Sequence, residues 1–280
     1  YGTQGSVLLF AVTIAVVILI VYTLLRWIDH LSKLGRVGET IDRVEQATIN
    51  AIKNRVQWPH LGGAAYPPEW MIPASAQIIS SHQTGYVQHI DVNALGAIAK
   101  TCEIKIFLDV LPGSFVHLDM PIARTVSLKK ERTEALHVSS EKILAALTIG
   151  VRRTFEHDPR FGLSVLSEIA SRALSPAVND PGTAIDVIGR GVRSLTCWSI
   201  PQEPAAKIDE NCEQVYLHRL MIDDLFDDFF APIARDGAGL IEVDLRLMKA
   251  LVSLAHIHPD MFGGPCTKHA DLLVKRANLA

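Results

Sequence analysis

The side chains best suited to chemistry lie in the segment RRTFEHDPRFG, which runs from Arg152 to Gly162. Glu156, His157 and Asp158 are adjacent residues whose side chains bind metal ions or transfer protons. Because neighbouring residues on a helix point in different directions, at most two of the three could face one metal. With Asp180 approaching from a later helix, they would form the site of a metal-dependent hydrolase. The spacing differs from HExxH, in which an interval of four places both histidines on one helix face.

A second polar stretch, from Arg172 to Ile188, separates two apolar helical patterns. Ser175 before Pro176 and Asp180 before Pro181 each match a capping side chain followed by proline at the first helical position. We interpret the stretch as a doubly capped helix junction that brings polar groups into the packed centre of the domain.

For both stretches we favour a structural role over a catalytic one. In this interpretation the acids cap helices and the arginines pair with acids, in a polar core network that is costly to break. Loss of Asp180 is then expected to impair folding or assembly before any reaction. No catalytic residue, metal ion or cofactor is assigned. The expected polar core network consists of Arg152, Arg153, Glu156, His157, Asp158, Arg160, Arg172, Asn179 and Asp180.

Other candidate residues match no known site pattern. No GxSxG motif surrounds Ser164 or Ser167, and the chain has no GxxxxGK[ST] phosphate loop. The acids of Asp223–Phe230 lack the glycine and spacing of an EF-hand loop, so we interpret them as a charged helix face with inward phenylalanines. The net charge of -3 argues against nucleic acid as a partner. Four scattered histidines are expected to be hydrogen-bonded structure rather than ligands: His82, His89, His117 and His137.

The elements that position these residues begin with an apolar run from Val7 to Leu25, which contains no charged residue. A helix needs about 20 apolar residues to cross the hydrocarbon layer, whereas a signal peptide has a shorter core that follows a basic stretch. We therefore expect a transmembrane helix over residues 1–27, with the lipid bilayer as partner. Basic residues follow this run, which favours a cytoplasmic position for the rest of the chain: Arg26, Lys33, Arg36 and Arg43.

Apolar residues continue from Ile28 to Ile52 at intervals of three, four or seven residues. This pattern predicts a juxtamembrane amphipathic helix over residues 28–58, bent near Gly35 and Gly38. Its apolar stripe either packs on the chain's own cytoplasmic domain or associates with further copies of the chain, and both alternatives stay open.

The remaining pattern predicts an α+β fold. Short β-branched runs broken by Gly and Pro predict a small β-rich unit over residues 59–137, with a helix in VNALGAIAKT. Helical periodicity over 143–155, 161–174 and 184–195 predicts a helical domain over residues 138–200, with its first helix ending at Asp158 and Pro159. Residues 201–280 are predicted to be mixed and mainly helical. Within them we expect a strand in CEQVYLHRLM and helices in DDLFDDFFAPIA and LIEVDLRLMKALVSLAHIH.

Four ordered blocks of the chain resemble a known family. They are TGYVQHIDVNAL, LPGSFVHLDMPI, IGVRRTFEHDPRFGLSVLSEIASRALSPAVNDPGTAIDVIGR and DDLFDDFFAPIARDGA. The set is similar to the bacterial predicted membrane protein family known as domain of unknown function 2254. The resemblance implies an integral inner-membrane protein with a cytoplasmic region and no established activity. Similar proteins carry several membrane helices upstream, so we expect either an N-terminally incomplete piece or upstream helices that are not placed in this chain.

The sequence thus predicts a non-enzymatic scaffold for a channel, a transporter or a sensor, with a cytoplasmic domain that forms homo-oligomers. The alternative is a membrane-anchored, metal-dependent hydrolase that uses Glu156, His157, Asp158 and Asp180.

Overall fold

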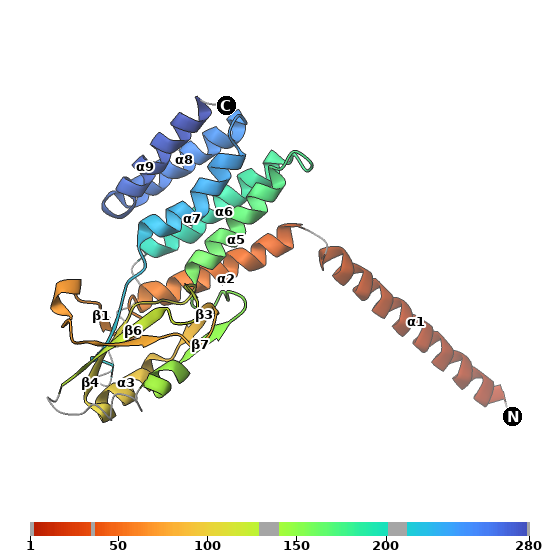
Figure 1. Cartoon of the computed structure of the whole chain (residues 1–280). Coiled ribbons are helices and arrows are strands. Elements are labelled where there is room, and N and C mark those ends of the chain that lie inside the picture. The colour runs from red at the N-terminus through yellow and green to blue at the C-terminus, as the bar shows by residue number, and fades with distance from the viewer. Residues whose placement is uncertain (1–2, 35–36, 129–139, 201–211, 279–280) are drawn as a thin grey trace. The chain divides into compact units, whose positions relative to one another are not determined.

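The computed structural model describes residues 3–34, 37–128, 140–200 and 212–278 (Figure 1). The described residues form a mixed α+β fold, as the sequence predicts. By packing, the chain divides into two compact units, unit 1 (Tyr1–Arg43) and unit 2 (Val44–Ala280).

Unit 1 contains helix α1 (Thr3–Leu34), which is long and apolar enough to cross a membrane. Residues Leu8–Ile28 have a mean hydropathy of 2.9 over 21 residues, and none of this stretch is buried. At about 1.5 Å per residue the stretch extends roughly 30 Å, the thickness of a hydrocarbon core. The hydroxyls of Thr13 and Thr23 donate to carbonyls four residues earlier, which satisfies both groups within the helix. The predicted bend falls partly on residues 35–36, outside those described.

Helix α2 (Val37–Gln57) leads from unit 1 into unit 2. In its unit 2 part, Thr48, Ala51 and Ile52 are buried. A Cβ atom on Gly162 of α5 (Pro159–Ala173) would lie 2.2 Å from the Thr48 hydroxyl oxygen. Helix α2 therefore packs closely against α5 only because residue 162 is glycine. Of the two predicted partners for the apolar stripe, the chain's own folded domain therefore covers this part of it.

Unit 2 contains two β-sheets among its described residues. The first has the strand order β1-β8-β4-β6-β2, in which β6 (Pro121–Ser127) is antiparallel to β4 (Ile104–Leu108) and to β2 (Gln77–Ser80). In the same sheet β8 (Val215–Leu217) is parallel to β4 and to β1 (Ala64–Ala65).

The second sheet has the order β5-β3-β7, with β3 (Gly85–Ile90) antiparallel to both β5 (Phe115–Val116) and β7 (Leu147–Gly150). The helix predicted in VNALGAIAKT is confirmed as α3 (Val92–Cys102), and a single 3-10 turn, η1, covers Glu69–Met71.

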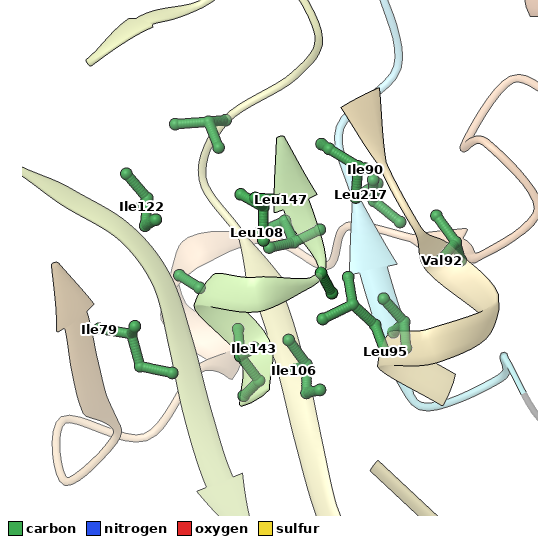
Figure 2. Close-up of a cluster of buried hydrophobic side chains, with 14 of the residues drawn as sticks. Ile79, Ile90, Val92, Leu95, Ile106, Leu108, Ile122, Ile143, Leu147 and Leu217 are labelled. Carbon is green, nitrogen blue, oxygen red and sulfur yellow. The ribbon is translucent and has the colours of Figure 1, made fainter. Parts of the chain in front are cut away.

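The hydrophobic core of the sheet region joins side chains from both sheets and from α3 (Figure 2). Leu95 of α3, Ile106 and Leu108 of β4, and Leu217 of β8 are fully buried, and Leu147 of β7 is 6% exposed. Each such side chain stabilises the fold by roughly 1.5–3 kcal/mol through removal from water. Strands β7 and β8 come from outside residues 59–137, so this core draws on parts of the chain beyond the predicted β-rich unit.

The prediction of a helix over residues 143–155 is wrong. Helical structure covers residues 140–145, whereas Leu147–Gly150 form β7. The β-branched residues of β7 suit a strand, and Ile149 pairs with Val87 of β3. Apolar residues at four-residue spacing are compatible with a helix, but pairing with a distant strand overrides this local preference. Asp158 and Pro159 accordingly begin a helix instead of ending one.

The remaining helices of unit 2 are α5 (Pro159–Ala173), α6 (Pro181–Ser199), α7 (Ile222–Asp236), α8 (Ile241–Ile257) and α9 (Pro259–Ala277). The first four confirm sequence predictions. Helix α5 packs against α6 and α7, α6 against α8, and α9 against α7 and α8 (Figure 1). Phe226, Phe229 and Phe230 of α7 are buried, which confirms their predicted inward orientation.

Of the two caps predicted for the junction between α5 and α6, one is confirmed and the other is wrong. Asp180 caps α6, since its carboxylate accepts from the Thr183 N–H at 3.0 Å. Ser175 begins no helix, because its hydroxyl donates back to the carbonyl of Arg172 at 2.7 Å and the next residues form a turn. Asn179, in the left-handed region with φ 48°, and Asp180 are both exposed, so the junction lies at the surface and not in a packed centre.

Candidate functional site

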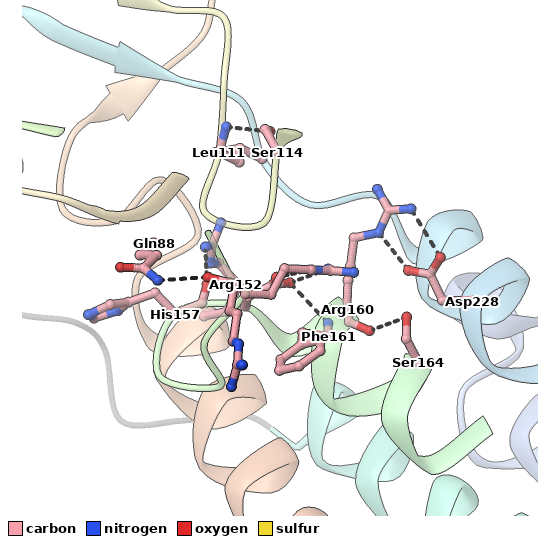
Figure 3. Close-up of polar contacts among 12 residues, drawn as sticks. Gln88, Leu111, Ser114, Arg152, His157, Arg160, Phe161, Ser164 and Asp228 are labelled. Atoms are coloured by element: carbon pink, nitrogen blue, oxygen red, sulfur yellow. Dashed lines mark hydrogen bonds and ion pairs between the residues drawn. The ribbon is translucent and has the colours of Figure 1, made fainter. Parts of the chain in front are cut away.

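The segment Arg152–Gly162 leads from β7 of the second sheet to α5 (Figure 3). Asp158 is its buried anchor. The Asp158 carboxylate is the N-cap of α5 and accepts from the Phe161 N–H at 3.0 Å. It also accepts two hydrogen bonds from Arg153, at 2.7 and 2.9 Å. Asp158 is 3% exposed, so this bidentate pair is largely removed from water.

A tight turn from Leu111 to Ser114 closes over the Asp158 carboxylate. Gly113 has φ +96°, and a Cβ atom there would lie 2.3 Å from Asp158 Oδ2. The Gly113 N–H donates to the carbonyl of Val87 in β3, at 2.8 Å. Glycine is therefore required twice, for its backbone conformation and for close contact with the carboxylate.

Arg160, in the first turn of α5, connects α5 to α7 (Figure 3). Its guanidinium donates to Asp228 at 2.6 and 3.2 Å and to Asp224 at 3.1 Å. The hydrogen bond with Asp228 raises the pKa of Arg160 further above its ordinary value, against the opposing effect of burial. The two acids stand four residues apart, so they lie on one face of α7.

Arg55, near the end of α2, contacts the Arg152–Gly162 segment as well. Its Nη2 donates to the carbonyl of His157 at 2.9 Å, and the residue is 2% exposed. Burial lowers the pKa of Arg55 to about 10, although Asp158 acts in the opposite direction. The pKa of His157 is also lowered, first by burial and then by the neighbouring His89, whose ring centre lies 4.9 Å away.

A cavity of about 490 Å³ borders this segment. Arg153, Arg160 and Asp224 contribute from the helical side, together with Asp109 and His218 from the sheet side. Burial lowers the pKa of His218.

The sheet side of this cavity has its own ion-pair cluster. Asp109 accepts from Arg124 at 2.7 and 3.1 Å and from the Tyr66 hydroxyl at 2.5 Å. Arg124 also pairs with Glu69, and Tyr66 stacks on His218 with ring centres 3.7 Å apart. Burial and the hydrogen bond to Asp109 raise the pKa of Tyr66, so the hydroxyl stays protonated.

A second, smaller cavity of about 290 Å³ lies beside the end of α2. Its lining consists of Ala51, Asn54, Arg55, Trp58, Leu61 and His157. The Gln88 side chain donates to the carbonyl of Arg152 at 2.7 Å, which fixes the backbone of the Arg152–Gly162 segment (Figure 3). The segment contributes to the lining of both cavities, through Arg153 and Arg160 in the larger one and His157 in the smaller one.

Residues 1–253 match the family described as "Predicted membrane protein (DUF2254)". The chain belongs to this family. The resemblance inferred from the four sequence blocks is therefore confirmed, and the family description agrees with the apolar stretch of α1.

Two relatives from mycobacteria are similar to this DUF2254 chain. "Uncharacterized protein Mb1321c" of Mycobacterium bovis and "Uncharacterized protein Rv1290c" of Mycobacterium tuberculosis are each 26% identical to it over 187 residues. The match covers 67% of this chain and 34% of each relative, so the chain spans about one third of the length of these curated relatives. No solved structure matches the chain.

The structure brings some of the sequence-predicted site residues together and separates others. Arg153, His157, Asp158 and Arg160 lie at the start of α5 and line or border the two cavities. Arg152 is exposed and contributes its backbone carbonyl, and the Glu156 side chain is 81% exposed.

The other predicted members lie at the far end of α5. Arg172, Asn179 and Asp180 are exposed there, about 20 Å along the helix from Asp158 at 1.5 Å per residue. They do not join the Asp158 cluster. Among the residues that the structure describes, no group of three or more His, Cys, Asp or Glu side chains is placed to hold a metal ion.

Several residues of the site were not predicted. Asp224 and Asp228 were interpreted only as a charged helix face, although their four-residue spacing signals a shared partner. Arg55 ends a polar-looking helix, and nothing in its neighbourhood in the sequence signals burial. Asp109 directly follows β4 and Arg124 lies in β6, so they become a pair only through the register of these two strands.

Proposed function

We propose that the chain is the membrane-anchored part of an inner-membrane protein whose unit 2 is a cytoplasmic, non-enzymatic sensor or gating domain. The observation that carries the proposal is an apolar helical stretch of membrane-spanning length, Leu8–Ile28, whose single charged residue, Arg26, lies near its end. A folded unit with cavities at its ion-pair network follows it along the chain.

A scaffold role is supported by the hydrogen bonds that four aspartates of unit 2 accept from arginines. Asp158, Asp224, Asp228 and Asp109 each accept hydrogen bonds from an arginine. Carboxylates held in this way connect elements of the fold, whereas a general base needs an accessible carboxylate beside its substrate.

The cytoplasmic orientation is supported by the charges that flank the span. Arg26 lies near the end of Leu8–Ile28, and Lys33, Arg36 and Arg43 follow this stretch in the sequence. Positive residues are retained on the cytoplasmic side of the inner membrane. Self-association through the membrane-proximal part of the chain belongs to the same proposal, since channels and transducing receptors act as symmetric assemblies.

The membrane anchor is tested by alkaline carbonate extraction of cell membranes containing the chain. We expect the protein to stay in the pellet, and we expect Ile18→Arg with Leu19→Arg to release it, because each charge costs about 3 kcal/mol at the centre of a span. Val252→Arg, which changes an exposed position on α8, is the matched control and should leave the protein in the pellet. Release of the unaltered chain would contradict the anchor.

The orientation is tested with reporters fused to Ala280. A fluorescent protein that folds only in the cytoplasm should be bright, and a phosphatase active only in the periplasm should be silent. The opposite pattern would overturn the cytoplasmic placement. Ion flux in liposomes that contain the full-length protein would identify gating of a channel, whereas a monomer in mild detergent without flux would contradict the assembly.

A further inference from the structure

Arg55 is a buried cation, and no carboxylate in residues 3–34, 37–128, 140–200 and 212–278 lies at hydrogen-bond distance from it. Its Nη2 donates to a backbone carbonyl, that of His157, at 2.9 Å. Within the described part of the chain, its Nη1 is buried and has no hydrogen-bond partner. Arg153 and Arg160 of the same site differ from it, because each forms bidentate hydrogen bonds with one aspartate.

Asp158 does not neutralise Arg55. Asp158 attracts it electrostatically, but both oxygens of that carboxylate accept from Arg153, and one also caps α5. A buried charge without its own counter-charge destabilises a fold substantially. The lowered pKa of Arg55 has burial as its main cause and reflects the same imbalance. An anion beside this guanidinium would correct it.

The smaller cavity offers the space for such an anion. It measures about 290 Å³, and Arg55 lines it together with Asn54, Trp58 and His157. These three side chains carry hydrogen-bond donors in the amide, the indole N–H and the imidazole. The remaining lining residues, Ala51 and Leu61, are apolar, so no carboxylate of the described residues lines the cavity. The larger cavity contrasts with it, because Asp109 and Asp224 line that one.

We propose that this cavity, named here the Arg55 cavity, binds a small oxyanion of the phosphate type through the guanidinium of Arg55 and the donors of Asn54, Trp58 and His157. Arginine suits this task because its planar fork presents paired N–H groups to the oxygens of one oxyanion. Free phosphate and the phosphate of a lipid headgroup share this chemistry.

Binding in the Arg55 cavity joins three parts of unit 2. Asn54 and Arg55 belong to α2, Trp58 follows that helix, and His157 belongs to the segment before α5. A bound oxyanion would therefore hold the end of α2 onto this segment. The oxyanion as the signal of a sensor rests on the proposed function, whereas the binding itself does not.

The test uses the full chain in nanodiscs of zwitterionic lipid, with inorganic phosphate as the probe. Thermal unfolding is followed by intrinsic fluorescence at rising phosphate concentration and, in parallel, in chloride at equal ionic strength. We expect phosphate to raise the unfolding midpoint, by about 5 °C at a concentration 100-fold above its Kd, because it binds the folded state. No rise beyond that in chloride, with either source of phosphate, would overturn the proposal.

Variants separate site binding from a general salt effect. Arg55→Met keeps the length of the side chain and removes the charge, so the phosphate-dependent rise should disappear. Lys53→Met removes an exposed charge from the same helix and should respond as the unaltered chain does. An equal rise in Arg55→Met and in the unaltered chain would assign the effect to the salt and contradict the site.

A second variant keeps the test decisive where Arg55→Met does not fold. Asn54→Leu changes an exposed residue at the rim of the cavity, and we expect it to weaken phosphate binding several-fold. An unchanged phosphate Kd in Asn54→Leu would count against the proposed donors.

A separate arm replaces part of the lipid with phosphatidic acid. An Arg55-dependent rise with inorganic phosphate assigns a soluble ligand, and a rise with phosphatidic acid alone assigns a lipid headgroup. Both results support an oxyanion at Arg55. If alkaline carbonate releases the chain from the membrane, the proposal of an anchored sensor is wrong, but an Arg55-dependent response to phosphate can still be measured. The two proposals therefore fail separately.

Discussion

The sharpest prediction compares alanine substitutions at two aspartates with the same local role. Asp158 and Asp180 each precede a proline, and each carboxylate accepts from the N–H three residues later at 3.0 Å. The two differ in surroundings, because Asp158 is buried against Arg153 and Asp180 is exposed. Asp158→Ala and Asp180→Ala therefore remove the same cap but only one buried ion pair.

The expected magnitudes follow from these contacts. Loss of an N-cap costs about 1 kcal/mol, which is the whole expected effect of Asp180→Ala. Removing one partner of a buried pair costs roughly 3–5 kcal/mol, and the lower end applies because the Arg153 side chain is 22% exposed. Asp158→Ala should thus cost about 4 kcal/mol, or roughly 10 °C in the unfolding midpoint, against about 3 °C for Asp180→Ala.

The assay is thermal and urea unfolding of the full chain in one detergent, with both variants measured side by side. Asp158→Asn keeps a cap oxygen and loses the charge, so its destabilisation should fall between those of the two alanine variants. Adding Arg153→Met to Asp158→Ala should restore part of the loss, because it removes the cation left without a partner. Equal destabilisation by the two alanine substitutions would refute the assignment of Asp158 as the buried anchor.

Three further predictions concern packing, charge and pH. Gly191→Ala should destabilise unit 2 by about 2 kcal/mol, because the new Cβ would lie 1.9 Å from the ring of Phe229. Glu45→Gln should cost about 2 kcal/mol in urea unfolding, because this buried carboxylate accepts from two arginines of α6, at 2.7 to 3.0 Å. The pKa of the buried His269 is lowered by burial, so stability should fall as the pH drops below about 6.5, where the unfolded chain binds a proton that the folded chain does not. His269→Phe should flatten this part of the pH profile of the urea midpoint.

The packing and charge predictions each have a matched control. Gly263→Ala places its Cβ where no atom lies within 4 Å, so it should be neutral or slightly stabilising in α9. Glu39→Gln breaks an exposed pair with Arg43 on one helix and should cost roughly 0.5 kcal/mol or less. For His269, an unchanged pH profile in the phenylalanine variant would show that its protonation does not contribute. Equal costs within either substitution pair would contradict the packing or the charge argument.

The sequence predicted the features that depend on local patterns. The apolar run of α1, the α3 helix and the helical periods of α5 to α8 were all visible, because each element repeats one preference over many residues. The strand β7 was missed because its four residues share their apolar spacing with a helix, and only pairing with β3 decides between the two. The helix α9 contains Pro265 and a pair of glycines, which concealed its periodicity.

The contacts of the candidate site also divide into local ones, which the sequence could indicate, and distant ones, which it could not. Arg153 and Asp158 are five residues apart, so their pairing is compatible with a local motif. The partners of Arg160 lie 64 and 68 residues away, and the carbonyl that Arg55 contacts lies 102 residues away. No periodicity specifies such contacts, which depend on how α2, α5 and α7 pack.

This division separates two kinds of substitution. The local pair holds the segment before α5 in place, so changes at Asp158 alter folding and any ligand response together. Arg55 reaches the segment from α2 and carries a charge that no described carboxylate takes up by hydrogen bonding, so its removal relieves a penalty while it deletes the main donor of the Arg55 cavity. Substitution of Arg55 by an apolar residue of similar length is therefore the change most able to separate stability from binding in this chain.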